Sequence, residues 1–261
     1  MTDPLYRLPE FSLRFVPIWR RNFMVWKKLA KASVLGNIAD PLITLIAFGY
    51  GLGGLLKSID GIPYIHYLAS GSICMSIMMA ASFEVLYSAF SRMHVQKTWE
   101  ALMNAPLSLD DVLLAELLWA ATKSLFSGVA ILAVMFMLDI GLHPQTQLVL
   151  PLLFLIGMCF SAIGLIVNAL ARGYDFFTYY FTLVLTPMVF LSGVYYPVSQ
   201  LPHWLERLSQ CLPLRAAVEL VRPLILGGWP DRVVFNLAIL LIYCIGGFYI
   251  AVILTRRRLL T

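Results

Sequence analysis

The chain has 261 residues, of which 60% are hydrophobic and only 13% are charged. Soluble domains are about 45–50% apolar and roughly 25% charged, so this composition, with a mean hydropathy of +0.82, excludes a soluble enzyme, a disordered chain and a disulfide scaffold. A polytopic helical membrane protein remains, and the net charge of +5 then reports topology rather than nucleic-acid binding.

An amphipathic segment comes first, over residues 1–31. Lysines and arginines fall on one face of it, and apolar residues recur on another at helical spacing, which is typical of a helix that lies in the headgroup plane. The apolar positions are Phe11, Phe15, Ile18, Trp19, Phe23 and Trp26. We expect Pro17 to bend or interrupt this helix. A plain basic anchor would give the same pattern, so a mechanical role for the segment stays open.

Six long runs with few charges follow. Each can form a helix that crosses about 30 Å of hydrocarbon, where backbone amides must be bonded within the segment. The predicted fold class is therefore all-α, with six transmembrane helices in a domain over residues 32–259. The predicted spans lie near residues 34–56, 66–90, 110–138, 148–171, 176–196 and 233–255.

The connection between the second and third predicted spans, residues 91–108, mixes charged and apolar side chains. It predicts a short amphipathic helix with exposed apolar surface, which suits docking in a groove of a partner protein. Trp99 and Met103 favour docking over a solvated connector.

Prolines punctuate the segment before the last span, residues 197–228. Apolar residues at helical spacing follow Pro202, and a second short helix is expected near residues 216–226. We expect these two helices to re-enter the membrane or to lie on its outer face.

The distribution of basic residues predicts the orientation of the chain. On the side of the two termini lie 13 of the 19 lysines and arginines, and 5 lie on the opposite side. Both termini are therefore expected in the cytoplasm.

Four charged residues fall inside predicted spans, where each costs roughly 2.5–3.5 kcal/mol at a helix centre. Lys123 follows Glu116 by two helical turns, so we expect Lys123 to pair with Glu84 or Glu116. Such a pair either fixes helix register or lines a substrate path. Asp40, directly before Pro41, is expected to cap a broken helix.

Catalytic and metal-binding patterns are missing from the sequence. The histidines are scattered, and there is no phosphate-binding loop that would hold ATP. Tyr179 and Tyr180 lie in an aromatic-rich span and could stack on sugar rings, although an aromatic belt at the membrane interface explains most of these residues. Two other function classes stay open: a lipid-modifying enzyme with Glu84 or Asp40 as base, and an ion-coupled carrier with acidic proton sites.

Several short motifs carry a family resemblance. The first set is Ala69-Ser70-Gly71, Ser82-Phe83-Glu84, Thr98-Trp99-Glu100-Ala101, Leu191-Ser192-Gly193, Leu212-Pro213-Leu214 and Arg222-Pro223. With the order of elements described above, this set resembles type-2 ABC transporter permeases. A second set resembles the nodulation protein J subgroup of that family. It comprises Trp26-Lys27-Lys28, Ser33-Val34-Leu35-Gly36-Asn37, Ala39-Asp40-Pro41-Leu42, Trp119-Ala120-Ala121-Thr122-Lys123 and Arg256-Arg257-Arg258-Leu259-Leu260.

The resemblance implies a permease subunit of an ATP-driven exporter in the bacterial inner membrane. It would act as a homodimer with a separate nodulation protein I-like ATPase, which would bind ATP and Mg²⁺, so no cofactor is expected in this chain. The loop over 91–108 would be the coupling helix, and its implied contact residues are His94, Gln96, Trp99, Glu100 and Met103. Because the subgroup exports lipo-chitooligosaccharides, the implied substrate is a lipo-oligosaccharide or another amphipathic molecule. The alternative within the family is efflux of a drug or small hydrophobic molecule.

Overall fold

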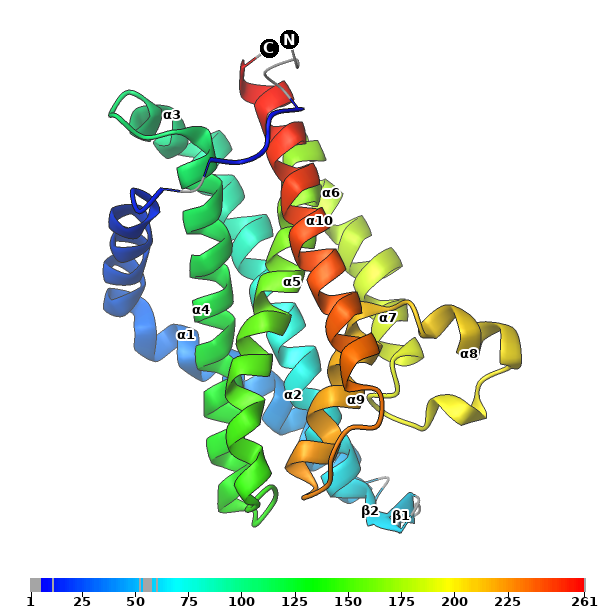
Figure 1. The fold of residues 1–261 in the computed structure, drawn as a ribbon. Coiled ribbons are helices and arrows are strands. Elements are labelled where there is room, and N and C mark those ends of the chain that lie inside the picture. The colour runs from blue at the N-terminus through cyan, green and yellow to red at the C-terminus, as the bar shows by residue number, and fades with distance from the viewer. Residues whose placement is uncertain (1–5, 11, 52, 54–57, 60, 261) are drawn as a thin grey trace.

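The computed structural model describes residues 6–10, 12–51, 53, 58–59 and 61–260, without the side chains of residues 29, 31–41, 50 and 260. Helices form a bundle. Within these ranges the only strands are β1 (Ser58–Ile59) and β2 (Ile62–Pro63), which have two residues each and pair as an antiparallel hairpin. The two termini and the short helix α3 (Thr98–Met103) lie at one end of the bundle, and the hairpin lies at the other (Figure 1). We call these the terminal end and the hairpin end.

The first helix, α1 (Phe15–Gly51), joins two elements that the sequence predicts as separate. It is one continuous helix that changes direction along its length (Figure 1). Pro17 lies in the first turn, where its missing N–H is not needed, so the predicted interruption at Pro17 is wrong. The helix also continues through Asp40, so the predicted break there is wrong; the Asp40 side chain lies outside the described part.

Four helices of the described part are long and apolar enough to cross a membrane. They cover Tyr64–Val95, Leu109–Met137, Pro144–Leu170 and Val233–Leu259, and they correspond to the second, third, fourth and sixth predicted spans. Their elements are α2 (Tyr64–Phe83) with the π-helical turns η2 (Glu84–Ala89) and η3 (Ser91–Val95), α4 (Leu109–Met137), η4 (Pro144–Leu148) with α5 (Val149–Leu170), and α10 (Val233–Leu260).

The fifth predicted span, 176–196, corresponds to a shorter apolar helix, Asp175–Leu191. It comprises α6 (Asp175–Tyr180), η5 (Phe181–Leu185) and α7 (Thr186–Leu191). The helix ends early because Gly193 adopts a left-handed conformation with φ of 74°, which stops an α-helix.

Two short helices occupy the segment before the last span. After the turn η6 (Val198–Gln200), α8 (His203–Ser209) begins directly after Pro202, and α9 (Pro213–Ile225) begins with a proline at its first position. α9 packs against α2, α5 and α10.

Polar contacts fix the start of α4 at the terminal end. Ser108 and Asp111 form a capping box that satisfies the first backbone amides of the helix. Asp110 accepts a hydrogen bond from Arg256 Nε of α10 at 3.1 Å, which joins the end of the last helix to the start of α4.

Candidate functional site

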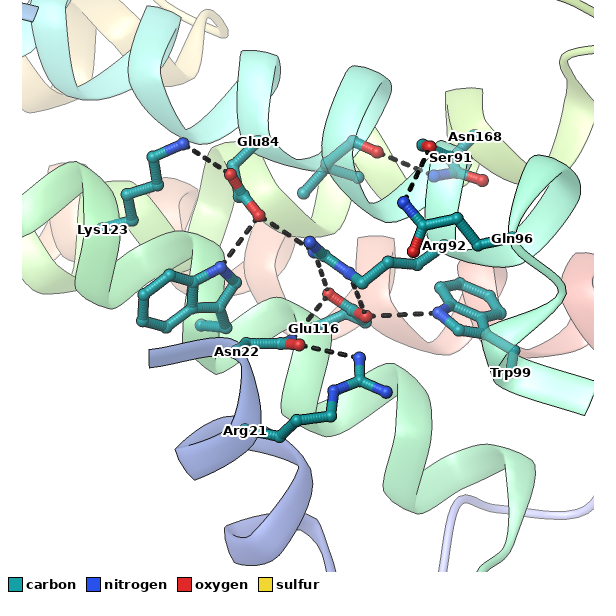
Figure 2. A network of polar contacts seen from close by, with 12 residues as sticks. Arg21, Asn22, Glu84, Ser91, Arg92, Gln96, Trp99, Glu116, Lys123 and Asn168 are labelled. Atoms are coloured by element: carbon teal, nitrogen blue, oxygen red, sulfur yellow. Dashed lines mark hydrogen bonds and ion pairs between the residues drawn. The ribbon is translucent and has the colours of Figure 1, made fainter. Parts of the chain in front are cut away.

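A buried cluster of charged residues lies near the end of the helix Tyr64–Val95, which comprises α2, η2 and η3 (Figure 2). We call this helix the second long helix, because α1 precedes it. The sequence places residue 91 in a loop, but η2 and η3 carry the helix on to Val95. π-helical turns are rare and often occur at functional sites. Asn168 of α5 donates a hydrogen bond to the Val85 carbonyl of η2 at 2.8 Å, so a side chain satisfies a backbone carbonyl of this irregular turn.

Glu84, at the start of η2, accepts hydrogen bonds from three donors. Lys123 Nζ lies 2.6 Å from its Oε2, and Trp119 Nε1 and Arg92 Nη2 lie 2.8 Å and 2.9 Å from its Oε1. The Glu84–Lys123 pair is one of the two pairs that the sequence predicts. Only 3% of the Glu84 side chain is exposed, so the pair is buried as expected.

Arg92 joins the two carboxylates of the cluster. Its Nε and Nη2 donate to the two oxygens of Glu116 at 2.9 Å and 2.6 Å, in the bidentate geometry that suits a guanidinium, and Nη2 also reaches Glu84. Sequence reasoning missed this residue because it placed Arg92 in a loop. The available signal was its separation from Glu84, which is about two turns of a helix that continues.

Glu116 connects α4 with two further segments. Trp99 Nε1 of α3 donates to its Oε1 at 3.2 Å, and Asn22 Nδ2 of α1 donates to its Oε2 at 3.3 Å. Trp99 is therefore buried, with 1% of its surface exposed, and the predicted exposed apolar surface at this residue is wrong. The indole turns inward because it fills the core and its N–H finds a buried carboxylate there.

The other predicted contact residues of this loop point in different directions. His94, Gln96 and Glu100 are exposed, and Met103 is half-buried against the core. The exposed side of the loop also carries an apolar side chain that the sequence reasoning did not select, Val95, which is 61% exposed.

The cluster is arranged for holding segments together rather than for proton abstraction. Both carboxylates are occupied by cationic and N–H donors, so neither is a free base. Breaking a buried ion pair by removing one partner costs about 3–5 kcal/mol, so these contacts strongly constrain the segments that carry them. Within the residues that the structure describes, no three His, Cys, Asp or Glu side chains gather as a metal site requires.

Tyr179 and Tyr180 of α6 take no part in the cluster. Tyr179 is exposed and Tyr180 is buried. Other rings stack between the second long helix and the helix Asp175–Leu191 with the residue before it. The Tyr87 ring lies 6.0 Å from the Tyr174 ring and 6.2 Å from the Phe181 ring.

A second buried cation lies toward the hairpin end. Arg222 of α9 donates from Nε to Ser70 Oγ at 3.1 Å and from Nη2 to the Gly193 carbonyl at 2.7 Å. Its guanidinium carbon lies 3.7 Å from the centre of the Tyr67 ring, within range of a cation–π contact. The Tyr67 hydroxyl also donates to the Gly193 carbonyl, at 3.0 Å. We call this group the Arg222 site.

Three of the short sequence motifs meet at the Arg222 site: Ala69-Ser70-Gly71, Leu191-Ser192-Gly193 and Arg222-Pro223. Position 71 requires glycine because the segment at Val194 and the Arg222 side chain pack directly on its backbone. A Cβ there would lie 2.8 Å from the Val194 carbonyl oxygen and 2.9 Å from Arg222 Nη2. The motifs therefore mark one junction of α2, α7 and α9.

Comparisons with known proteins agree with this architecture. Residues 14–226 match the family described as ABC-2 type transporter. The chain is 42% identical over 254 residues to nodulation protein J of Sinorhizobium fredii (strain NBRC 101917 / NGR234), which covers 97% of each chain. It is 40% identical to nodulation protein J of Rhizobium meliloti (strain 1021), again over 97% of each chain. It is 24% identical to the inner membrane transport permease YadH of Escherichia coli (strain K12), over 92% of this chain and 93% of the other. The resemblance carried by the motifs is confirmed: this multi-pass membrane protein belongs to the ABC-2 type transporter family.

Proposed function

We propose that this chain is the permease subunit of an ATP-driven exporter and that a separate ATPase of the nodulation protein I type supplies the energy. One observation carries the proposal: α3 is bonded through Trp99 to the buried Glu116, and Glu116 is bonded to Arg92. A force applied to α3 from outside the bundle would therefore reach the long helices through this series of contacts.

The two faces of the α3 region suit this coupling role. Its buried face holds Trp99 against Glu116, while its exposed face presents Gln96 and Glu100 at the terminal end of the bundle. A short helix with one face free can dock in a groove of a partner. The proposed partner surface is thus the exposed face, and the proposed transmission path is the buried one.

The proposed assembly contains two copies of this chain and two ATPases in the bacterial inner membrane, with both termini in the cytoplasm. The excess of basic residues on the side of the termini supports this orientation. In this topology the second part of α1 and the helix Asp175–Leu191 are spans in addition to the four long apolar helices. ATP and Mg²⁺ are held by the ATPase.

The proposed substrate is a lipo-oligosaccharide or another amphipathic molecule that leaves the cytoplasm. Similarity to nodulation protein J over nearly the whole chain supports this choice over a drug or small hydrophobic molecule, because the resemblance to that subgroup implies a lipo-oligosaccharide substrate. Radiolabelled substrates of both kinds, offered to the same vesicles, separate the two alternatives.

Co-expression tests the proposal. Inverted membrane vesicles are prepared with this chain alone, with its ATPase alone, and with both, and ATP hydrolysis and lipo-chitooligosaccharide uptake are measured. We expect uptake only with both chains, and loss of uptake when the P-loop lysine of the ATPase is replaced. Uptake by this chain alone, or uptake abolished by an uncoupler but not by ATP depletion, would overturn the proposal. Lipid turnover without ATP that is lost on Glu84→Gln would favour an enzyme instead.

A further inference from the structure

A hollow of about 440 Å³ opens beside the charged cluster, between α1 and the pair formed by the second long helix and α4. We call it the α1 pocket. Its polar lining includes Arg21, Arg92, Lys123 and Glu84, and its walls include the indoles of Trp26 and Trp119. The two indole rings meet edge to face with centroids 6.1 Å apart, so the pocket combines charge with apolar surface.

The charges around the α1 pocket do not balance. Arg92 and Lys123 are paired with carboxylates, but Arg21 makes no ion pair with a carboxylate of the described residues. Its Nη2 donates to the neutral amide of Asn22 at 2.8 Å. Burial lowers the pKa of the Arg21 guanidinium, and the charge of Glu116 acts against that shift. A half-buried guanidinium thus faces the pocket with one positive charge in surplus.

A second hollow, of about 690 Å³, continues from the α1 pocket along the same helix and shares Arg21 and Val25 with it. We call it the α1 groove. It adds the cations Arg20 and Lys28, and its lining includes no carboxylate. Its aliphatic side chains are exposed: Val16 by 43%, Met24 by 48% and Val25 by 59%.

Positive charge next to exposed aliphatic surface defines the chemistry of the occupant. A guanidinium binds phosphate oxygens in bidentate fashion, and clustered basic residues attract anionic lipid headgroups. A free phosphate ion would leave Val16, Met24 and Val25 in water, whereas an acyl chain would cover them. A zwitterionic choline headgroup would bring its ammonium among the cations of the groove, which lowers its affinity.

We propose that the α1 pocket and the α1 groove bind an anionic phospholipid, with its phosphate on Arg21 and an acyl chain along Val16, Met24 and Val25. The lipid would compensate the surplus charge and would hold the first part of α1 against the charged cluster. The contacts proposed for the phosphate and the acyl chain lie on α1, whereas those proposed for the ATPase lie on the exposed face of the α3 region; Gln96 of that face also lines the α1 pocket.

Native mass spectrometry tests this site on the purified full chain, exchanged into nanodiscs with equal parts of phosphatidylglycerol and phosphatidylcholine. We expect the chain to retain phosphatidylglycerol in preference, and Arg21→Gln to reduce that preference about fivefold, as expected for one lost guanidinium–phosphate contact. Arg207→Gln removes an exposed cation of α8 that lies in neither hollow, and it should leave the preference unchanged. Arg21→Lys keeps the charge and should retain part of the preference, with gel filtration confirming that each variant is folded.

Three outcomes would overturn the site. The first is no preference for phosphatidylglycerol in the unchanged chain. The second is an equal loss in Arg21→Gln and Arg207→Gln, which would indicate a general charge effect. The third is displacement of the lipid by soluble glycerol phosphate at the same concentration, which would assign the site to a free phosphate ester. No ATPase and no exported substrate are present, so this result is independent of the proposed transport function.

Discussion

The charged cluster and the Arg222 site hold their cations by different means. At the terminal end, Arg92 lies between two carboxylates at 2.6–2.9 Å. Toward the hairpin end, Arg222 is held by a hydroxyl, a backbone carbonyl and an aromatic face, without an ion pair to a carboxylate of the described residues. One site balances charge with charge, and the other balances charge with dipoles.

The difference predicts different mechanical roles. A guanidinium shared by two carboxylates can exchange one contact for the other, so the charged cluster can change partners while its charge stays compensated. The Arg222 site depends on close approach of backbone at Gly71 and Gly193, so its geometry is fixed by the fold. We therefore expect motion at the terminal end and a rigid junction toward the hairpin end.

Arg92→Met gives the largest expected effect. It leaves Glu84 and Glu116 close together without their shared cation, and breaking a buried ion pair in this way costs about 3–5 kcal/mol of unfolding free energy. Unfolding of the purified chain by SDS, followed by tryptophan fluorescence, measures the loss. Adding Glu116→Gln should recover most of it, because Glu84 then keeps Lys123 as its ion-pair partner and no carboxylate of the cluster is left without a cation. A double variant as unstable as the single one would contradict the ion-pair description.

Arg222→Met should lower the free energy of unfolding by less, about 2–3 kcal/mol in the same assay. It removes hydrogen bonds from a charged donor, but it leaves no carboxylate without its partner. Here neutralising a nearby acid, as in Glu219→Gln, should not restore stability. Arg207→Met, which changes an exposed arginine of α8, serves as the control and should lie within about 0.5 kcal/mol of the unchanged chain. Rescue by Glu219→Gln would show that the Arg222 site also works by charge pairing.

Lys123→Met is expected to give the smallest change, about 1.5 kcal/mol, since Glu84 keeps Arg92 and Trp119 as donors. Combining it with Glu84→Gln should give less than the sum of the two single effects, because the residues are partners. Strictly additive losses in the double-mutant cycle would mean that the pair contributes nothing specific.

The sequence predicts part of the charged cluster because it shows which charged residues fall in apolar runs and how far apart along a helix they lie. Charges inside apolar runs are expensive, and Lys123 is the cation in reach of either acid, so its pairing with Glu84 is foreseeable. Arg92 is missed because π-helical turns extend the helix beyond the apolar run that defines the predicted span, so its spacing from Glu84 has meaning only once the helix is known to continue. Trp99 is misjudged since side-chain burial depends on what the rest of the fold supplies, here the carboxylate of Glu116.

The fold shows the same division between local and tertiary information. Four long helices lie close to their predicted positions because their hydrophobic length alone selects them. The end of the fifth depends on a single left-handed glycine, Gly193, and its position in the structure is explained by the bonds of its carbonyl to Arg222 and Tyr67. Those partners are far away in sequence, so no local pattern predicts that junction.

The central claim is that the charged cluster transmits motion between α3 and the long helices. Its most direct test is permease-stimulated ATP hydrolysis in a reconstituted assembly of this chain with its ATPase. The charge-neutral double variant Arg92→Met with Glu116→Gln, which leaves Glu84 paired with Lys123, is compared with the unchanged chain. Provided that the double variant is folded and still binds the ATPase, we predict that stimulation is lost, because the charged contacts that join Trp99 through Glu116 to residue 92 and Glu84 are gone. Stimulation equal to that of the unchanged chain would contradict the claim.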